Sequence, residues 1–83
     1  MSLRNSITVR GFRFKLDIRF DKSAEYECRG ETYIDDYGDE QVEPALEEAA
    51  YKLRDNLKSQ GYDAHICWSE KGWIGVGIVN INI

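Results

Sequence analysis

The sequence predicts a small α+β domain with the order β-β-α-β-β, in which a four-stranded, mainly antiparallel sheet carries one helix on one face. Three observations predict this fold class. Apolar and charged residues alternate over residues 12–20, apolar residues recur with helical spacing over 46–57, and two more alternating segments follow Gly61. A length of 83 residues fits one domain, so we expect residues 1–83 to form a single unit.

The first two strands are predicted as a hairpin. The apolar positions of its first strand are Phe12, Phe14, Leu16, Ile18 and Phe20. The preceding residues alternate in the opposite phase, so Gly11 marks a bulge or a tight turn. The second strand is expected over residues 24–34. Placing Phe20 opposite Tyr26 gives a five-residue loop, Asp21 to Glu25. This register makes three cross-strand pairs of opposite charge, Arg19–Glu27, Asp17–Arg29 and Lys15–Glu31.

One helix is predicted in the middle of the chain, after a turn over residues 35–40. We expect it to run from about Glu43 to Gln60, because Pro44 is tolerated in a first helical turn. Gly61 suits the left-handed position that ends a helix. Its apolar stripe, expected to pack on the sheet, consists of Leu46, Ala49, Ala50, Leu53 and Leu57.

The last two strands are predicted on either side of a three-residue loop, residues 70–72, with Gly72 in the left-handed position. This loop sets Ser69 opposite Trp73. It also places three apolar pairs on the inner face, Trp68–Ile74, Ile66–Val76 and Ala64–Ile78.

The final strand is apolar on both faces, which singles it out. Its outward positions are Trp73, Gly75, Gly77, Val79, Ile81 and Ile83. Such a strand is either a covered central strand or one that contacts another chain. The two glycines either leave a furrow beside Trp73 or accommodate large neighbours that lie across them.

The charge is unevenly distributed along the chain. The net charge of -4 combines +3 over residues 1–29, -8 over 30–51 and +1 over 52–83. The overall balance argues against general attraction to nucleic acids and anionic membranes. The acidic stretch includes Asp35, Asp36, Asp39, Glu40, Glu43 and Glu47. A solvated surface near the helix N-terminus explains these residues, and a docking surface for a basic partner is the sharper alternative.

No catalytic, metal or cofactor site is predicted. Asp63, His65, Cys67 and Ser69 share the outer face of one strand. Neighbours on such a face lie roughly 6.5–7 Å apart, whereas a nucleophile and its base need about 2.6–3.2 Å. His65 and Cys67 are two ligands where structural zinc requires four. A calcium loop starting at Asp35 would lack glycine at its sixth position and glutamate at its twelfth.

Localisation signals are few. There is no run of roughly 18 apolar residues that would cross a membrane and no apolar stretch of the signal-peptide type. The two cysteines, Cys28 and Cys67, are too few for a disulfide scaffold and are expected on opposite faces of the sheet. We therefore expect a cytoplasmic protein, and a phage or prophage source is equally compatible.

The leading functional hypothesis is a non-enzymatic binding or interaction module, homodimeric through the outer face or the edge of the last strand. The alternatives are the acidic docking surface and nucleic-acid binding through the first hairpin. That hairpin carries Arg13, Lys15, Arg19 and Arg29 near Tyr33, with Asp17, Glu27 and Glu31 interleaved. Small phage-encoded domains share the element order, which by itself implies no activity.

Overall fold

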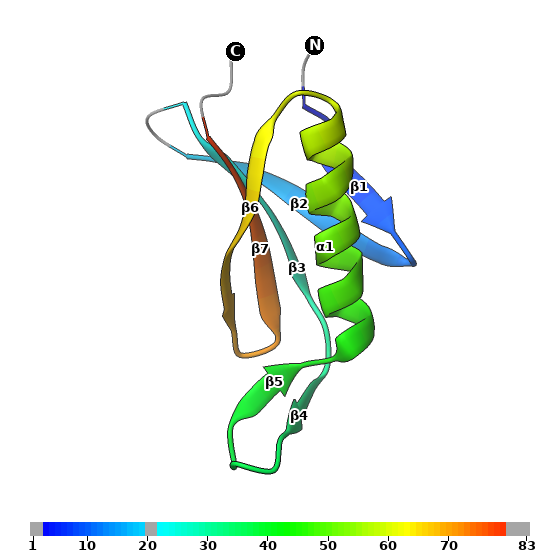
Figure 1. The fold of residues 1–83 in the computed structure, drawn as a ribbon, viewed down its shortest axis with the longest axis vertical. Helices are drawn as coiled ribbons and strands as arrows, with labels where there is room; N and C mark the ends of the chain where they lie inside the picture. Colours follow the sequence, from blue (N-terminus) through cyan, green and yellow to red (C-terminus); the bar gives the residue numbers. More distant parts are fainter. Residues whose placement is uncertain (1–2, 20–21, 80–83) are drawn as a thin grey trace.

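The computed structural model describes residues 3–19 and 22–79 (Figure 1). Its elements are β1 (Ser6–Val9), β2 (Phe12–Ile18), β3 (Ala24–Arg29), β4 (Thr32–Ile34), β5 (Glu40–Val42), α1 (Pro44–Ser59), β6 (Asp63–Glu70) and β7 (Trp73–Val79). The fold is α+β, with one helix and antiparallel pairing throughout the described strands, as the sequence predicts.

The predicted number of strands is wrong. The main sheet has five strands in the order β1-β2-β3-β7-β6, and β4 and β5 form a second, two-stranded sheet. Arg10 and Gly11 have φ of 52° and 83°, so they form a two-residue turn that folds the preceding segment back as β1. The strand expected over residues 24–34 breaks at Gly30, whose N–H donates to the carbonyl of Gly72 at 2.8 Å.

The register predicted for the first hairpin is also wrong. Leu16 lies opposite Tyr26, the position expected for Phe20, and Asp17 faces Glu25. Phe20 itself is outside the described residues. The observed register differs from the charge-matched one by four residues. It is tolerated because the guanidinium of Arg19, beyond the end of β2, neutralises Asp17 and Glu25 together.

The last hairpin is correctly predicted at one end and wrong at the other. Ile66 faces Val76 and Ala64 faces Ile78, as expected. The loop, however, has two residues, since Lys71 and Gly72 take φ of 50° and 85°. A bulge between Ile66 and Trp68 absorbs the one-residue difference. Trp68 therefore pairs with Gly75 rather than Ile74 and moves to the outer face, because a slip of one residue reverses the direction of a side chain.

The helix covers the inner face of the main sheet (Figure 1). The five residues of its predicted apolar stripe are all buried, and Gly61, with φ of 95°, follows its last turn as expected. On the sheet side the largest buried residues are Phe14, Tyr26, Ile74, Val76 and Ile78. The Tyr26 hydroxyl donates to the carbonyl of Arg4 at 2.6 Å, which satisfies its polar atom in the core.

β7 is a central strand. It pairs with β3 on one side over Trp73–Ile78 and with β6 on the other over Trp73–Val79. Association through an edge of this strand is therefore closed along these residues, while the sheet face that α1 leaves uncovered stays open. α1 is the only helix among the described residues, and it is too short and too polar to span a bilayer.

Candidate functional site

The outer face of the main sheet brings together the outward residues of three neighbouring strands. Successive rows across β3, β7 and β6 are Arg29–Trp73–Glu70, Glu27–Gly75–Trp68 and Glu25–Gly77–His65. The face thus carries one exposed tryptophan at one end, a second tryptophan in the middle and acidic residues beside both glycines.

Of the two expected roles of the β7 glycines, the structure shows the second, because large neighbours lie across them. A Cβ atom on Gly75 would lie 2.8 Å from Cε2 of Trp68, so the indole ring lies directly against the glycine backbone. The indole Nε1 donates to Oε2 of Glu25 at 3.1 Å. A Cβ on Gly77 would lie 3.2 Å from both Cys67 Cβ and the His65 ring. The glycines therefore make room for side chains of the same chain.

Three acidic residues of this face share one arginine. Nη2 of Arg19 lies 3.0 Å from Asp17, 3.0 Å from Glu25 and 2.8 Å from Glu27. Burial raises the pKa of Glu25, but hydrogen bonds from Trp68 and Arg19 outweigh burial and leave that pKa below its ordinary value. Burial and the neighbouring Glu25 raise the pKa of Glu27. The charge of Arg19 is thus neutralised by three carboxylates of its own chain, so this residue offers little positive charge to a ligand.

A small hollow of about 130 Å³ lies beside this cluster, lined by Glu25, His65, Cys67 and Gly77 among others. The Cys67 thiol lies 3.3 Å from the Gly75 carbonyl and is hydrogen-bonded to it. Burial, reinforced by the charge of Glu25, raises the pKa of Cys67 to about 11. No hydrogen bond joins Cys67 to His65 within residues 3–19 and 22–79, and the same ranges hold no cluster of three potential metal ligands.

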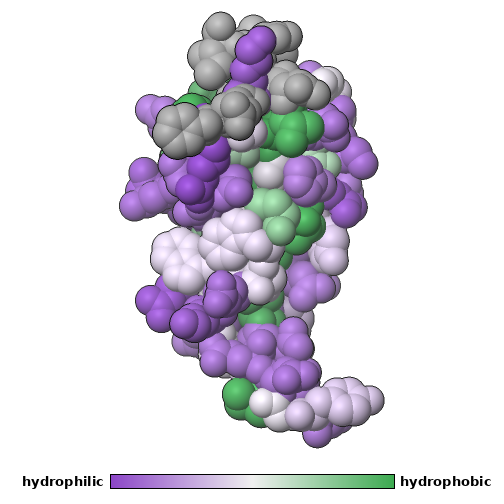
Figure 2. All heavy atoms as spheres, turned by 90° about the vertical axis from the view of Figure 1, so that its left-hand side faces the viewer, coloured by the Kyte–Doolittle hydropathy of each residue, from purple (hydrophilic) through white to green (hydrophobic). Residues whose placement is uncertain are grey.

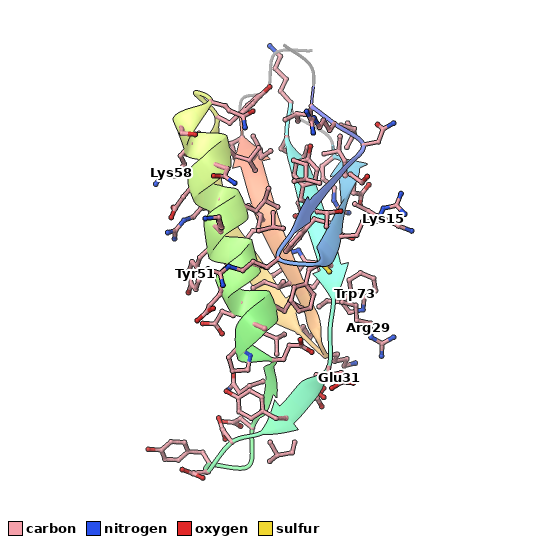
Figure 3. All side chains as sticks on the ribbon, turned by 90° about the vertical axis from the view of Figure 1, so that its right-hand side faces the viewer. Lys15, Arg29, Glu31, Tyr51, Lys58 and Trp73 are labelled. Atoms are coloured by element: carbon pink, nitrogen blue, oxygen red, sulfur yellow. The ribbon has the colours of Figure 1, made fainter. Side chains whose placement is uncertain are left out.

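One exposed group on the outer face, which we call the Trp73 strip, is formed by Arg13, Lys15, Arg29 and Trp73. Trp73 is 39% exposed, whereas the next five residues of β7 are buried. Figure 3 shows Lys15, Arg29 and Trp73 projecting on the side of the sheet away from α1. Within the described part of the chain, none of the three cations makes an ion pair, in contrast to Arg19.

The predicted acidic residues gather mainly in a second feature, the β4–β5 arm (residues 31–42), which extends from the body of the molecule (Figure 1). Asp35 shapes its turn, since its Oδ1 accepts the N–H groups of Tyr37 and Asp39 at 2.9 Å each. These bonds, with one from Gln41, lower the pKa of Asp35. Asp36, Asp39 and Glu40 are exposed along the turn and β5, and no ion pair involves them in the described ranges.

The two remaining acidic residues have other positions. Glu43 precedes α1 and its Oε2 accepts the N–H of Glu31 at 2.7 Å, which fixes the root of the arm. Glu47 lies in the first turn of α1, where its negative charge interacts favourably with the positive end of the helix dipole. The predicted acidic surface is therefore divided between an arm, a structural contact and a helix end.

The arm also carries exposed apolar side chains that the sequence reasoning did not single out. Ile34 is 64% exposed and Tyr37 is 90% exposed. In Figure 2 the body shows a narrow apolar band between hydrophilic residues, and further apolar and aromatic atoms lie at the end of the arm. Tyr33 belongs to the arm too, so it does not lie beside the cations of the first hairpin. The interleaving of these residues with Asp35 and Asp36 is the signal that could have revealed the arm.

Two other predicted residues lie at the end of the last strand. Val79 is half-buried at the end of β7, and Ile81 is outside the described residues. Trp68, which fills the centre of the outer face, was missed because its predicted direction followed from a loop one residue too long. No protein-family model, curated protein or solved structure matches the chain.

Proposed function

We propose that this chain is a non-enzymatic, cytoplasmic binding module that self-associates through the outer face of its main sheet. The observation that carries the proposal is the Trp73 strip. It combines a tryptophan with two arginines and a lysine that make no ion pair in the described chain, on a face that α1 does not cover. Tryptophan and arginine are enriched where protein surfaces bind one another.

Two further observations support this proposal. The Cys67 thiol, with a pKa of about 11, is protonated at neutral pH and is a poor nucleophile, which counts against a cysteine-dependent enzyme. Both cysteines are free thiols, with Cys28 buried under the helix side of the sheet and Cys67 on the outer side. Free thiols are typical of a reducing compartment.

Self-association is tested by light scattering after size-exclusion chromatography over a range of concentrations. We expect the wild type to exceed the 9.6 kDa monomer mass at micromolar concentrations. Trp73→Ala should raise the dissociation constant of self-association by about tenfold or more, which is the loss of affinity typical when a central aromatic side chain of an interface is removed. Tyr51→Ala is the matched control, because Tyr51 is 41% exposed on the opposite side, on α1. A 9.6 kDa monomer at every concentration, or equal effects of both variants, would overturn the proposal.

Single-stranded nucleic acid is the second candidate for the same strip. Its support is that Arg29 lies beside Trp73, with Arg13 and Lys15 on the same face one strand further away, so that a base could stack on the indole ring near these cations. Electrophoretic mobility shifts with mixed oligonucleotides at low salt test this candidate. Binding that Trp73→Ala and Arg29→Glu both abolish would support it, and no shift by the wild type would end it.

A further inference from the structure

We propose that the element bound by the Trp73 strip is the β4–β5 arm of a second copy of this chain. The inference rests on the proposed self-association and names the two surfaces that meet. One copy presents the strip on its main sheet, and the other presents the exposed residues of its arm.

The two surfaces are complementary in charge. The strip carries Arg13, Lys15 and Arg29, and the arm carries Asp36, Asp39 and Glu40, all six without an ion pair in the described chain. Matching potentials of this kind speed encounter and fix the relative orientation of two partners. The chain that is acidic overall thus contains its own basic surface and a partner for it.

The same surfaces also match in apolar character. Ile34 and Tyr37, at 64% and 90% exposure, leave the arm with apolar area that its own chain does not cover. Trp73 supplies a large ring at one side of the cations, next to Arg29 across the β3–β7 pair. Burying these side chains against one another would add a hydrophobic contribution that charge alone does not give.

The arm is held in shape before any partner arrives. Its turn is fixed by the bonds of Asp35, and its root is fixed by the contact of Glu43 with Glu31. Gly30, just before the arm, is pressed against the helix, since a Cβ there would lie 2.8 Å from Cδ2 of Leu46. A rigid arm loses little conformational entropy on binding. It extends beyond the body of the molecule in Figure 1, so a neighbouring copy can reach it.

Two charge-reversed variants test the inference. The face variant is Arg13→Glu/Arg29→Glu, which leaves Lys15 opposite Glu27, and the arm variant is Asp36→Lys/Glu40→Lys. All four residues are exposed and make no side-chain hydrogen bond or ion pair in the described chain, so both variants should keep the wild-type melting temperature. We expect each variant alone to be monomeric and their equimolar mixture to regain the wild-type mass. Lys52→Glu/Lys58→Glu on α1 is the control and should associate as the wild type does.

The outcomes separate this inference from the proposed function. If the arm variant associates as tightly as the wild type while Trp73→Ala does not, the arm is not the occupant and the outer face still mediates association. A mixture that stays monomeric also overturns the inference. A wild type that stays monomeric removes both proposals. If the wild type and the arm variant are monomers that bind an oligonucleotide, and the face variant does not bind it, the strip is a nucleic-acid site instead.

Discussion

Gly75→Ala should destabilise the protein, although the added group is one methyl on a sheet surface. The new Cβ would lie 2.8 Å from Cε2 and 3.0 Å from Cδ1 of Trp68. Its nearest neighbour would be Nε1 of the same ring, which is closer still, so the indole must lift by roughly 1 Å to restore ordinary van der Waals contact. Overpacking of this kind costs about 1–3 kcal/mol. Weakening the Trp68–Glu25 hydrogen bond costs about 1 kcal/mol more. Replacing a strand glycine by alanine stabilises the fold by about 0.5–1 kcal/mol, because alanine loses less conformational entropy on folding.

The net expectation is a loss of about 1–3 kcal/mol in the free energy of unfolding. For a chain of this length each kcal/mol lowers the melting temperature by about 4–8 °C. Urea denaturation followed by circular dichroism measures the free energy directly. In the background of Trp68→Ala the same change should become neutral or stabilising, because the ring it displaces is gone. A neutral Gly75→Ala, or an equal cost in both backgrounds, would refute the reasoning.

Three further predictions use the same assays. Leu53→Ala should cost about 2–5 kcal/mol because this side chain is fully buried between α1 and the sheet, and near-native melting would contradict its place in the core. The lowered pKa of Glu25 means that its ionised form stabilises the fold above its ordinary pKa of 4.5 and that this contribution is lost as the pH falls. The pKa of Glu27 is raised, so its ionised form does not stabilise the fold in this way. Glu25→Gln should therefore lower the free energy of unfolding at pH 7 while Glu27→Gln should not, and equal losses would contradict the assignment. Cys67, with a pKa of about 11, should react with iodoacetamide at pH 7.5 about 100-fold more slowly than in the urea-unfolded chain, and similar rates would contradict its burial.

The helix was predicted closely because the signals that define it are local. Its expected span, Glu43 to Gln60, differs from Pro44–Ser59 by one residue at each end. Proline at its start, glycine after its end and the apolar stripe all act within a few residues of one another. The first alternating segment likewise gave the direction of Phe14, which is fully buried.

Strand order and register were harder because they depend on contacts between distant residues. Charge matching failed for the first hairpin, since the long side chain of Arg19 reaches Asp17, Glu25 and Glu27 without lying directly opposite each of them. A single flexible cation can therefore satisfy a register that pairwise charge counting rejects.

The sequence predicts some residues of the candidate site but not Trp68, which lies at its centre. The sequence singled out Trp73 and both glycines of β7, but it placed Trp68 in the core. A lysine with positive φ at position 71 shortened the loop, and the bulge before Trp68 corrected the register further along. Lysine is uncommon at such a position, so local turn chemistry gave no warning.

The outer face holds both tryptophans of the chain, while the buried aromatic residues in the described ranges are Phe14 and Tyr26. The intrinsic fluorescence of the protein therefore comes mainly from the surface proposed to bind a partner. Trp68, hydrogen-bonded to Glu25, and Trp73, open to water, should differ in emission wavelength and in quenching by iodide. Binding at the Trp73 strip would change the emission of one ring and leave the other as an internal reference. Tryptophan fluorescence can therefore detect a partner that binds this face without an added label.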